Sequence, residues 1–184
     1  MKNAFQIISI LVIASAILTS CKKGCRDAAA TNYDEKAKIN DGCVYYSKFQ
    51  INSVKLVTYP NVNSSAVPWD SGDNADCYMR IMDSGDQILF QSDKYDNVST
   101  EVSWTLNPVI TISDLSNYMW IMIRDYDTDY IDSGSELIVK AFFPVSDYIS
   151  FPGTVSEDGT GKYPDIIELN EGGATIQISV TWQL

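Results

Sequence analysis

The sequence predicts an all-β protein in which residues 47–184 form an antiparallel, eight-stranded β-sandwich. Residues 175–184 alternate strictly, because Ile176, Ile178, Val180, Trp182 and Leu184 are apolar and the residues between them are polar. Alternation with a period of two is typical of a strand with one buried face. No long 3.6-residue apolar period occurs in this region, and turn residues separate its apolar runs. Short strands between such turns indicate a sandwich.

Residues 1–20 have the features of a secretory signal peptide. A lysine precedes an uncharged, mostly apolar run over residues 4–18, which is too short for a membrane span. The run ends in Leu-Thr-Ser-Cys21, which resembles a bacterial lipobox. The resemblance implies lipid on Cys21, export, and a place at the outer membrane or elsewhere in the cell envelope. Ordinary cleavage near residue 14 or 16 is the alternative.

Residues 21–46 form a separate, disulfide-closed N-terminal segment. If Cys21 carries lipid, Cys25, Cys43 and Cys77 remain. Cys25 and Cys43 bracket one compact stretch, so we expect them to pair in an oxidising compartment. Closing this loop stabilises the segment by roughly 3 kcal/mol. We expect Cys77 to be buried and free, and a bridge from Cys77 to either partner is the competing arrangement.

This segment also resembles a short cysteine motif of exported Bacteroidetes proteins. The matching residues are Cys25, Asp27, Ala30, Asn32, Tyr33, Ala37, Asp41, Gly42 and Cys43. The resemblance implies a structural spacer between the lipid anchor and the sandwich.

The strands of the sandwich are expected where apolar runs lie between turns. These runs cover residues 48–58, 77–82, 87–91, 98–106, 109–113, 118–124, 136–142, 166–169 and 175–184. In residues 48–58 the apolar phase slips between Ile51 and Val54, which indicates a β-bulge. Residues 118–124 are apolar on both faces, as is typical of a central strand, whereas Asn107 and Pro108 predict a turn.

Charge and composition narrow the possible functions. Residues 47–184 carry seven Lys/Arg and twenty Asp/Glu, a net charge of −13, and the chain contains no histidine. Such an acidic surface repels nucleic acid and bare anionic lipid. Without histidine the chain lacks the commonest general base and His-ligated zinc. We therefore expect no catalysis, although a glycosidase-type pair of carboxylates remains an alternative.

Aspartates gather at two places, each beside a predicted strand. The first group precedes residues 77–82 and the second follows residues 118–124. The groups are Asp70, Asp73 and Asp76, and Asp125, Asp127, Asp129 and Asp132. Crowded carboxylates repel one another unless a cation lies among them, and Ca²⁺ accepts six to eight oxygen ligands in flexible geometry. The groups therefore predict a calcium site, and solvated acidic loops are the alternative.

Residues 49–184 resemble the C2 domain, the calcium-dependent lipid-binding β-sandwich of protein kinase C and synaptotagmin. Asp70 and Asp76, followed by Tyr78, have the spacing of the family's first calcium loop, although Cys77 stands where the family has proline. The stretch from Asp125 to Asp132 is similar to the family's third calcium loop. Leu-Asn-Pro108 is similar to a turn that the family has between these calcium loops. The residues for which the resemblance implies a role as Ca²⁺ ligands are Asp70, Asp76, Asp125, Asp127 and Asp132, with Asp73 and Asp129 as spare carboxylates.

The sequence thus predicts a lipid-anchored, non-catalytic envelope protein whose calcium-loaded tip contacts a membrane or another partner surface. The resemblance implies phospholipid as that surface, with Trp69, Tyr130 and Ile131 either inserting into it or packing against neighbouring loops. The alternative is an adhesin-like module that binds a glycan or a protein, with calcium purely structural or absent.

Overall fold

The computed structural model describes residues 22–70, 72–127, 136–149 and 163–184. The chain divides into two compact units, one built chiefly on Met1–Tyr46 and the other on Ser47–Ile149 with Val155–Gln183. The predicted signal peptide and Cys21 lie outside the described residues. The single helical element described is η1 (Val145–Tyr148), a 3₁₀ turn, so no described helix has the length and apolar character needed to cross a membrane.

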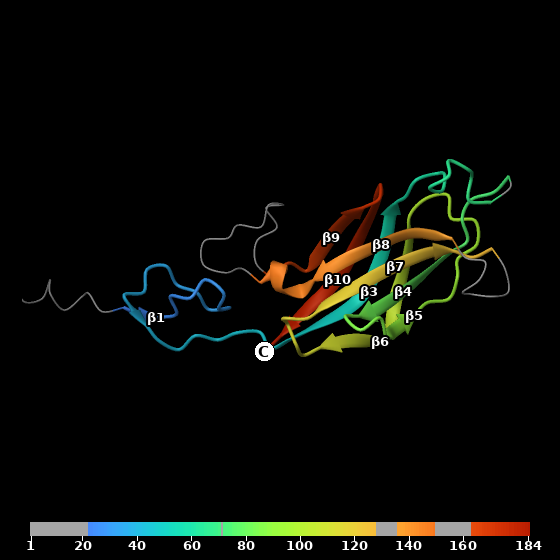
Figure 1. Ribbon diagram of the computed structural model, residues 1–184. Helices are drawn as coiled ribbons and strands as arrows, with labels where there is room; N and C mark the ends of the chain where they lie inside the picture. Colours follow the sequence, from blue (N-terminus) through green and yellow to red (C-terminus); the bar gives the residue numbers. More distant parts are fainter. Residues whose placement is uncertain (1–21, 71, 128–135, 150–162) are drawn as a thin grey trace, which may run out of the picture. The chain divides into compact units, whose positions relative to one another are not determined.

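The larger unit is a sandwich of two four-stranded antiparallel sheets (Figure 1). One sheet has the order β6-β3-β10-β9 and the other the order β5-β4-β7-β8. The strands are β3 (Lys48–Thr58), β4 (Cys77–Asp83), β5 (Ile88–Gln91), β6 (Val102–Ile112), β7 (Tyr118–Asp125), β8 (Leu137–Pro144), β9 (Ile166–Glu171) and β10 (Ala174–Gln183). The predicted fold class is therefore confirmed.

The core lies between the sheets. Phe49 of β3 meets Phe143 of β8 edge to face, with ring centroids 5.8 Å apart, which joins one sheet to the other. Each large side chain buried in this way contributes about 1.5–3 kcal/mol. The largest fully buried side chains are Phe49, Ile51, Leu56, Met79, Ile81, Met119, Ile121, Ile123, Phe143, Ile167, Ile176 and Ile178.

The predicted bulge in β3 is present at Asn52. Ile51 pairs with Val180 and Ser53 with Ser179, so Asn52 is the extra residue between them. The extra residue restores the phase of the strand, because Ile51 and Val54 are then both fully buried. Strand β7 lies between β4 and β8, as its two apolar faces predicted.

The structure corrects three details of the strand prediction. Residues 98–101 are not part of β6, because the amide of Val98 donates to the carbonyl of Ala75 in a neighbouring loop. The predicted turn at Pro108 does not end the strand: β6 continues, although its pairing with β3 is interrupted between Thr105 and Ile110. Leu184 is 72% exposed, because the pairing of β10 ends at Gln183.

The smaller unit is closed by the predicted Cys25–Cys43 disulfide, with the two Cα atoms 4.7 Å apart. Strands β1 (Lys23–Gly24) and β2 (Ile39–Asn40) form one short parallel pair. The buried apolar residues of the smaller unit are small, namely Cys25, Ala30 and Ala37. A core of this size needs the disulfide to remain folded.

Polar residues of the cysteine motif complete this unit by internal hydrogen bonds. The Asn32 side chain accepts from the Val44 amide and donates to the Gly42 carbonyl. Asp27 accepts the Tyr45 hydroxyl at 2.7 Å. These contacts, together with the disulfide, hold the segment in one folded arrangement.

Candidate metal centre

The pairing of β4 with β7 brings the two aspartate groups together. These strands are antiparallel neighbours, and Cys77 at the start of β4 pairs with Asp125 at the end of β7. The loop that precedes β4 and the residues that follow β7 therefore leave the sheet at the same end of these two strands. This places Asp70, from the first loop, next to Asp125 and Asp127.

Asp70, Asp125 and Asp127 form what we call the acidic cluster. One carboxylate oxygen from each of the three lies within 4.8 Å of those from the other two. Two oxygens on opposite sides of a calcium ion are about 5 Å apart, because each lies about 2.3–2.6 Å from the ion. Three carboxylates supply up to six oxygens, so number, chemistry and spacing suit Ca²⁺.

Asp125 is the structural centre of this cluster. Its side chain has no exposed surface. One oxygen, Oδ1, accepts the Asp76 amide at 2.7 Å. The other, Oδ2, is buried and has no hydrogen-bond partner among the described residues. A buried carboxylate oxygen without a partner is energetically costly, and a bound cation would remove that cost.

The electrostatics of the cluster agree with this geometry. Burial, and then the charges of Asp127, Asp70 and Asp76, raise the pKa of Asp125 to about 7, against the hydrogen bond from the Asp76 amide. The pKa of Asp70 is raised by burial and by Asp127. Burial and the charge of Glu136 raise the pKa of Asp127. Asp125 itself acts in the opposite direction and lowers the pKa of Asp127 by a side-chain hydrogen bond. Neighbouring carboxylates disfavour the charged forms of Asp70 and Asp125, and a divalent cation would reverse this effect.

Asp76 adjoins the cluster but uses its oxygens elsewhere. Its Oδ1 accepts the Asn97 amide at 2.9 Å, and its Oδ2 lies 3.1 Å from the Lys94 ammonium. Asp73 lies outside the group of three and caps its own loop by accepting the Asn74 amide. The remaining predicted ligand, Asp132, and the spare Asp129 lie outside the described residues.

Two charged residues near the cluster, Glu136 and Lys94, were not predicted from the sequence to belong to the site. The carbonyl of Glu136 accepts the Asp125 amide, and its carboxylate accepts the Asn63 side chain at 2.8 Å. The sequence offered one sign of this role, because Glu136 is an acidic residue directly before strand β8. Lys94 is separated by 18 residues from its partner Asp76, and no local pattern links them.

The charge of the cluster also raises the pKa values of Tyr59 and Cys77. Burial first, and then nearby Cys77 and the carboxylates of Asp125 and Asp70, raise the pKa of Tyr59 to about 12. Its hydroxyl donates to the Val98 carbonyl. Burial and the charge of Asp125 raise the pKa of the Cys77 thiol to about 12. Cys77 is thus buried and free, as predicted, and its thiol stays protonated at neutral pH.

Of the two roles expected for Trp69, insertion into a membrane or packing against loops, the structure shows packing. Trp69 is 9% exposed, and its indole donates to the Pro60 carbonyl at 2.6 Å, so it packs within its loop. Tyr130 and Ile131 lie outside the described residues. Val67 is instead 52% exposed, in a turn that the Asn63 side chain ties to Glu136.

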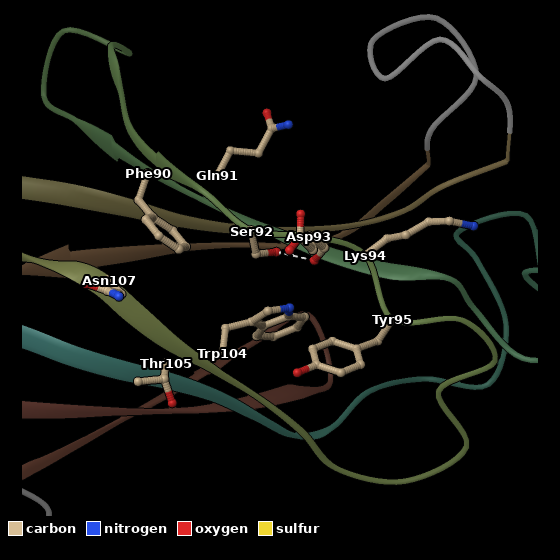
Figure 2. A pocket seen from close by; sticks show the side chains of 9 residues that line it. All are labelled: Phe90, Gln91, Ser92, Asp93, Lys94, Tyr95, Trp104, Thr105 and Asn107. Carbon is tan, nitrogen blue, oxygen red and sulfur yellow. Dashed lines mark hydrogen bonds between the residues drawn. The ribbon is translucent and has the colours of Figure 1, made fainter.

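A separate cavity of about 470 Å³ lies where the edge strands β5 and β6 of the two sheets face each other (Figure 2). Trp104 and Tyr95 pack edge to face in it, with ring centroids 6.1 Å apart. The buried Trp104 indole nitrogen has no hydrogen-bond partner among the described residues. The cavity is lined by Phe90, Gln91, Ser92, Asp93, Lys94, Tyr95, Trp104, Thr105 and Asn107. Its single carboxylate, Asp93, does not supply the pair that a glycosidase requires.

No family model and no curated protein matches the sequence. Among solved structures, the chain is similar to C2 domains. One such structure, described simply as a C2 domain, is 12% identical, with a TM-score of 0.45 and coverage of 74% of this chain and 98% of that one. A C2 domain of plant Extended Synaptotagmin 1 is 12% identical, with a TM-score of 0.47 and coverage of 75% and 95%.

A third similar structure contains two C2 domains of Extended-Synaptotagmin 2 with calcium bound. It is 13% identical, with a TM-score of 0.41, and the match covers 73% of this chain and 44% of that one. At these identities the similarity concerns the fold and assigns no ligand to this chain.

Proposed function

We propose that this chain is a lipid-anchored, non-catalytic envelope protein that binds Ca²⁺ at Asp70, Asp125 and Asp127 and contacts a membrane surface with the loaded tip. Asp132 would add oxygens to the same ion. The observation that carries the proposal is the buried Asp125 carboxylate, whose Oδ2 lacks a partner among the described residues while two other carboxylates lie beside it.

Calcium would neutralise the acidic cluster and so change what the tip can contact. Without the ion, the carboxylates repel an anionic lipid surface. With the ion, that repulsion falls and vacant coordination positions can accept lipid phosphate oxygens. The exposed Val67, tied through Asn63 to the side of the cluster, supplies an apolar contact for the membrane interface.

The calcium site is tested by Tb³⁺ titration of the full chain, since Trp69 precedes Asp70 and can sensitise a lanthanide bound there. We expect saturable luminescence that Ca²⁺ abolishes by competition. Asp127→Asn should weaken binding by about tenfold, because it removes one charged ligand. Asp147→Asn, in η1, is the matched control and should bind as the wild type does. Equal binding by the wild type and Asp127→Asn would place the ion elsewhere.

Membrane contact is tested by sedimentation with vesicles of phosphatidylcholine and phosphatidylserine. The chain carries Cys21→Ser so that an acyl anchor does not mask the result. We expect sedimentation in millimolar Ca²⁺ and not in chelator, with a clear loss for Val67→Ser. Calcium binding without calcium-dependent sedimentation would reject membrane contact while leaving the ion site intact.

A second candidate function is glycan binding, and the cavity beside β6 favours it. A sugar-binding site needs an aromatic ring whose face can pack against the sugar. It also needs polar groups that form hydrogen bonds with the sugar hydroxyls. Tyr95, which is 48% exposed, provides the ring, and Asp93 provides the polar group, in a cavity of about 470 Å³ whose floor includes the buried Trp104. A glycan array in chelator is the test, with Tyr95→Ala as the variant that should lose any signal.

A further inference from the structure

The side chain of Lys94 occupies a cation position at the edge of the acidic cluster. Its ammonium lies 2.6 Å from Asp96 Oδ1 and 3.1 Å from Asp76 Oδ2. It also lies 5.1 Å from the centre of the Tyr126 ring. Figure 2 shows this side chain extending away from Trp104 and Asp93. The ammonium is therefore held by two carboxylates and an aromatic face.

Lys94 is connected to the cluster through Asp76. The same residue whose carboxylate faces Lys94 donates its amide to Asp125 Oδ1. The charge of Asp76 also raises the pKa of Asp70 and Asp125. Lys94 thus neutralises a carboxylate that would otherwise add to the repulsion within the cluster.

The ammonium of Lys94 places a positive charge between two carboxylates, as a bound cation would. It lies 2.6 and 3.1 Å from them, the range of charge-assisted hydrogen bonds. An ammonium is a compact point charge on a flexible stem, so Lys94 can fill such a position and can also leave it.

We propose that Lys94 is a built-in cation that competes with calcium for Asp76, and that it sets both the affinity and the number of ions bound at this tip. The proposal rests on the calcium site proposed above. With Lys94 in place, Asp76 is withheld from the metal, and the acidic cluster accepts one ion. When Lys94 is removed, Asp76 becomes available as a ligand for calcium.

The test compares the wild type with Lys94→Met, which keeps an apolar stem and removes the charge. Lys140→Met is the matched control. Lys140 also pairs with an aspartate, Asp86, at 3.5 Å, and also lies over an aromatic ring, that of Trp120, at 4.5 Å. Asp86 follows β4, whereas the acidic cluster lies at the start of that strand, so this pair does not include a carboxylate of the cluster.

Calorimetric titration of the full chains with Ca²⁺ in mild detergent measures the affinity. We expect Lys94→Met to bind about tenfold more tightly than the wild type, as the removal of a unit charge beside a divalent ion predicts. Lys140→Met should bind as the wild type does. The difference should persist at about 0.5 M salt, where exposed charges more than about 4–5 Å apart are screened.

Thermal unfolding gives a second readout. In chelator, Lys94→Met should melt at a lower temperature than the wild type, because Asp76 and Asp96 lose their counter-charge. In saturating Ca²⁺ this order should disappear or reverse. Lys140→Met should differ from the wild type by the same amount in both conditions.

The outcomes separate the two proposals. Equal Ca²⁺ affinity of the wild type and Lys94→Met, or a difference that vanishes at high salt, overturns the role of Lys94 and leaves the calcium site standing. Binding by Lys94→Met alone supports Lys94 as a competing cation and contradicts calcium binding by the wild type. Absence of binding in all three proteins overturns both.

Discussion

The substitution Asp125→Asn separates the energetic cost of this carboxylate from its use as a ligand. Asp125 is fully buried, and its pKa is raised from 3.8 to about 7, first by burial and then by neighbouring carboxylates. Asparagine has nearly the same shape, and its side-chain oxygen can still accept the Asp76 amide. Its amide group can donate where the unpartnered Oδ2 now lies.

The size and the pH dependence of the effect follow from the pKa. The difference between 3.8 and about 7 corresponds to roughly 4 kcal/mol as an upper bound. Below pH 3.8 the carboxyl is protonated in the folded and unfolded states, so the folded state has no penalty. As the pH rises towards 7, the unfolded state loses its proton first, and the free energy of unfolding falls. Above the folded-state pKa the penalty is constant.

Without calcium, Asp125→Asn should therefore match the wild type near pH 4 and exceed it at pH 8 by about 2–4 kcal/mol. With calcium in excess the order should change. Calcium at about 100 times its Kd adds roughly 2.7 kcal/mol to the wild type, and the variant, which lacks the central ligand, should gain much less. Urea unfolding followed by tryptophan fluorescence, at both pH values and with calcium or chelator, measures all four cases.

Asp147→Asn is the control and should show neither effect. An Asp125→Asn variant that is less stable than the wild type at pH 8 in chelator would refute the reasoning about burial. A gain in stability that is the same at pH 4 and pH 8 would refute it as well, because the penalty belongs to the ionised carboxylate.

Three further predictions concern the anchor, the spacer and the core. Cys21→Ser should move the protein from the detergent phase to the aqueous phase in Triton X-114 partitioning of host cells, and retention in detergent would indicate another anchor. Replacing Cys25 and Cys43 with serine should cost the N-terminal unit roughly 3 kcal/mol, so limited proteolysis should cut it while the sandwich survives; uncut protein would show that the disulfide is dispensable. Phe49→Ala, which removes the edge-to-face contact with Phe143, should destabilise the sandwich by about 3–5 kcal/mol in urea unfolding, and a loss below about 1 kcal/mol would contradict the place of Phe49 in the core.

Local patterns in the sequence determined the fold class and most strands. The alternation that ends at Trp182 matches β10, whose inward residues are buried from Ala174 onwards. The phase slip in residues 48–58 predicted a bulge between Ile51 and Val54, and the strand register places it at Asn52. Cysteine spacing predicted the Cys25–Cys43 disulfide. These features depend on residues near in sequence, because backbone geometry alone fixes which side chains share a face.

The sequence also identified the aspartates of the candidate site, but only the tertiary structure decided how they are used. The pairing of Cys77 with Asp125 brings Asp70 beside Asp125 and Asp127 and buries Asp125 completely. The same fold directs the Asp76 carboxylate towards Lys94. Burial and ion pairing depend on which strands become neighbours, and strand pairing is a long-range property. A count of aspartates could predict a cation site, whereas the environment of each carboxylate came from the packing of strands distant in the sequence.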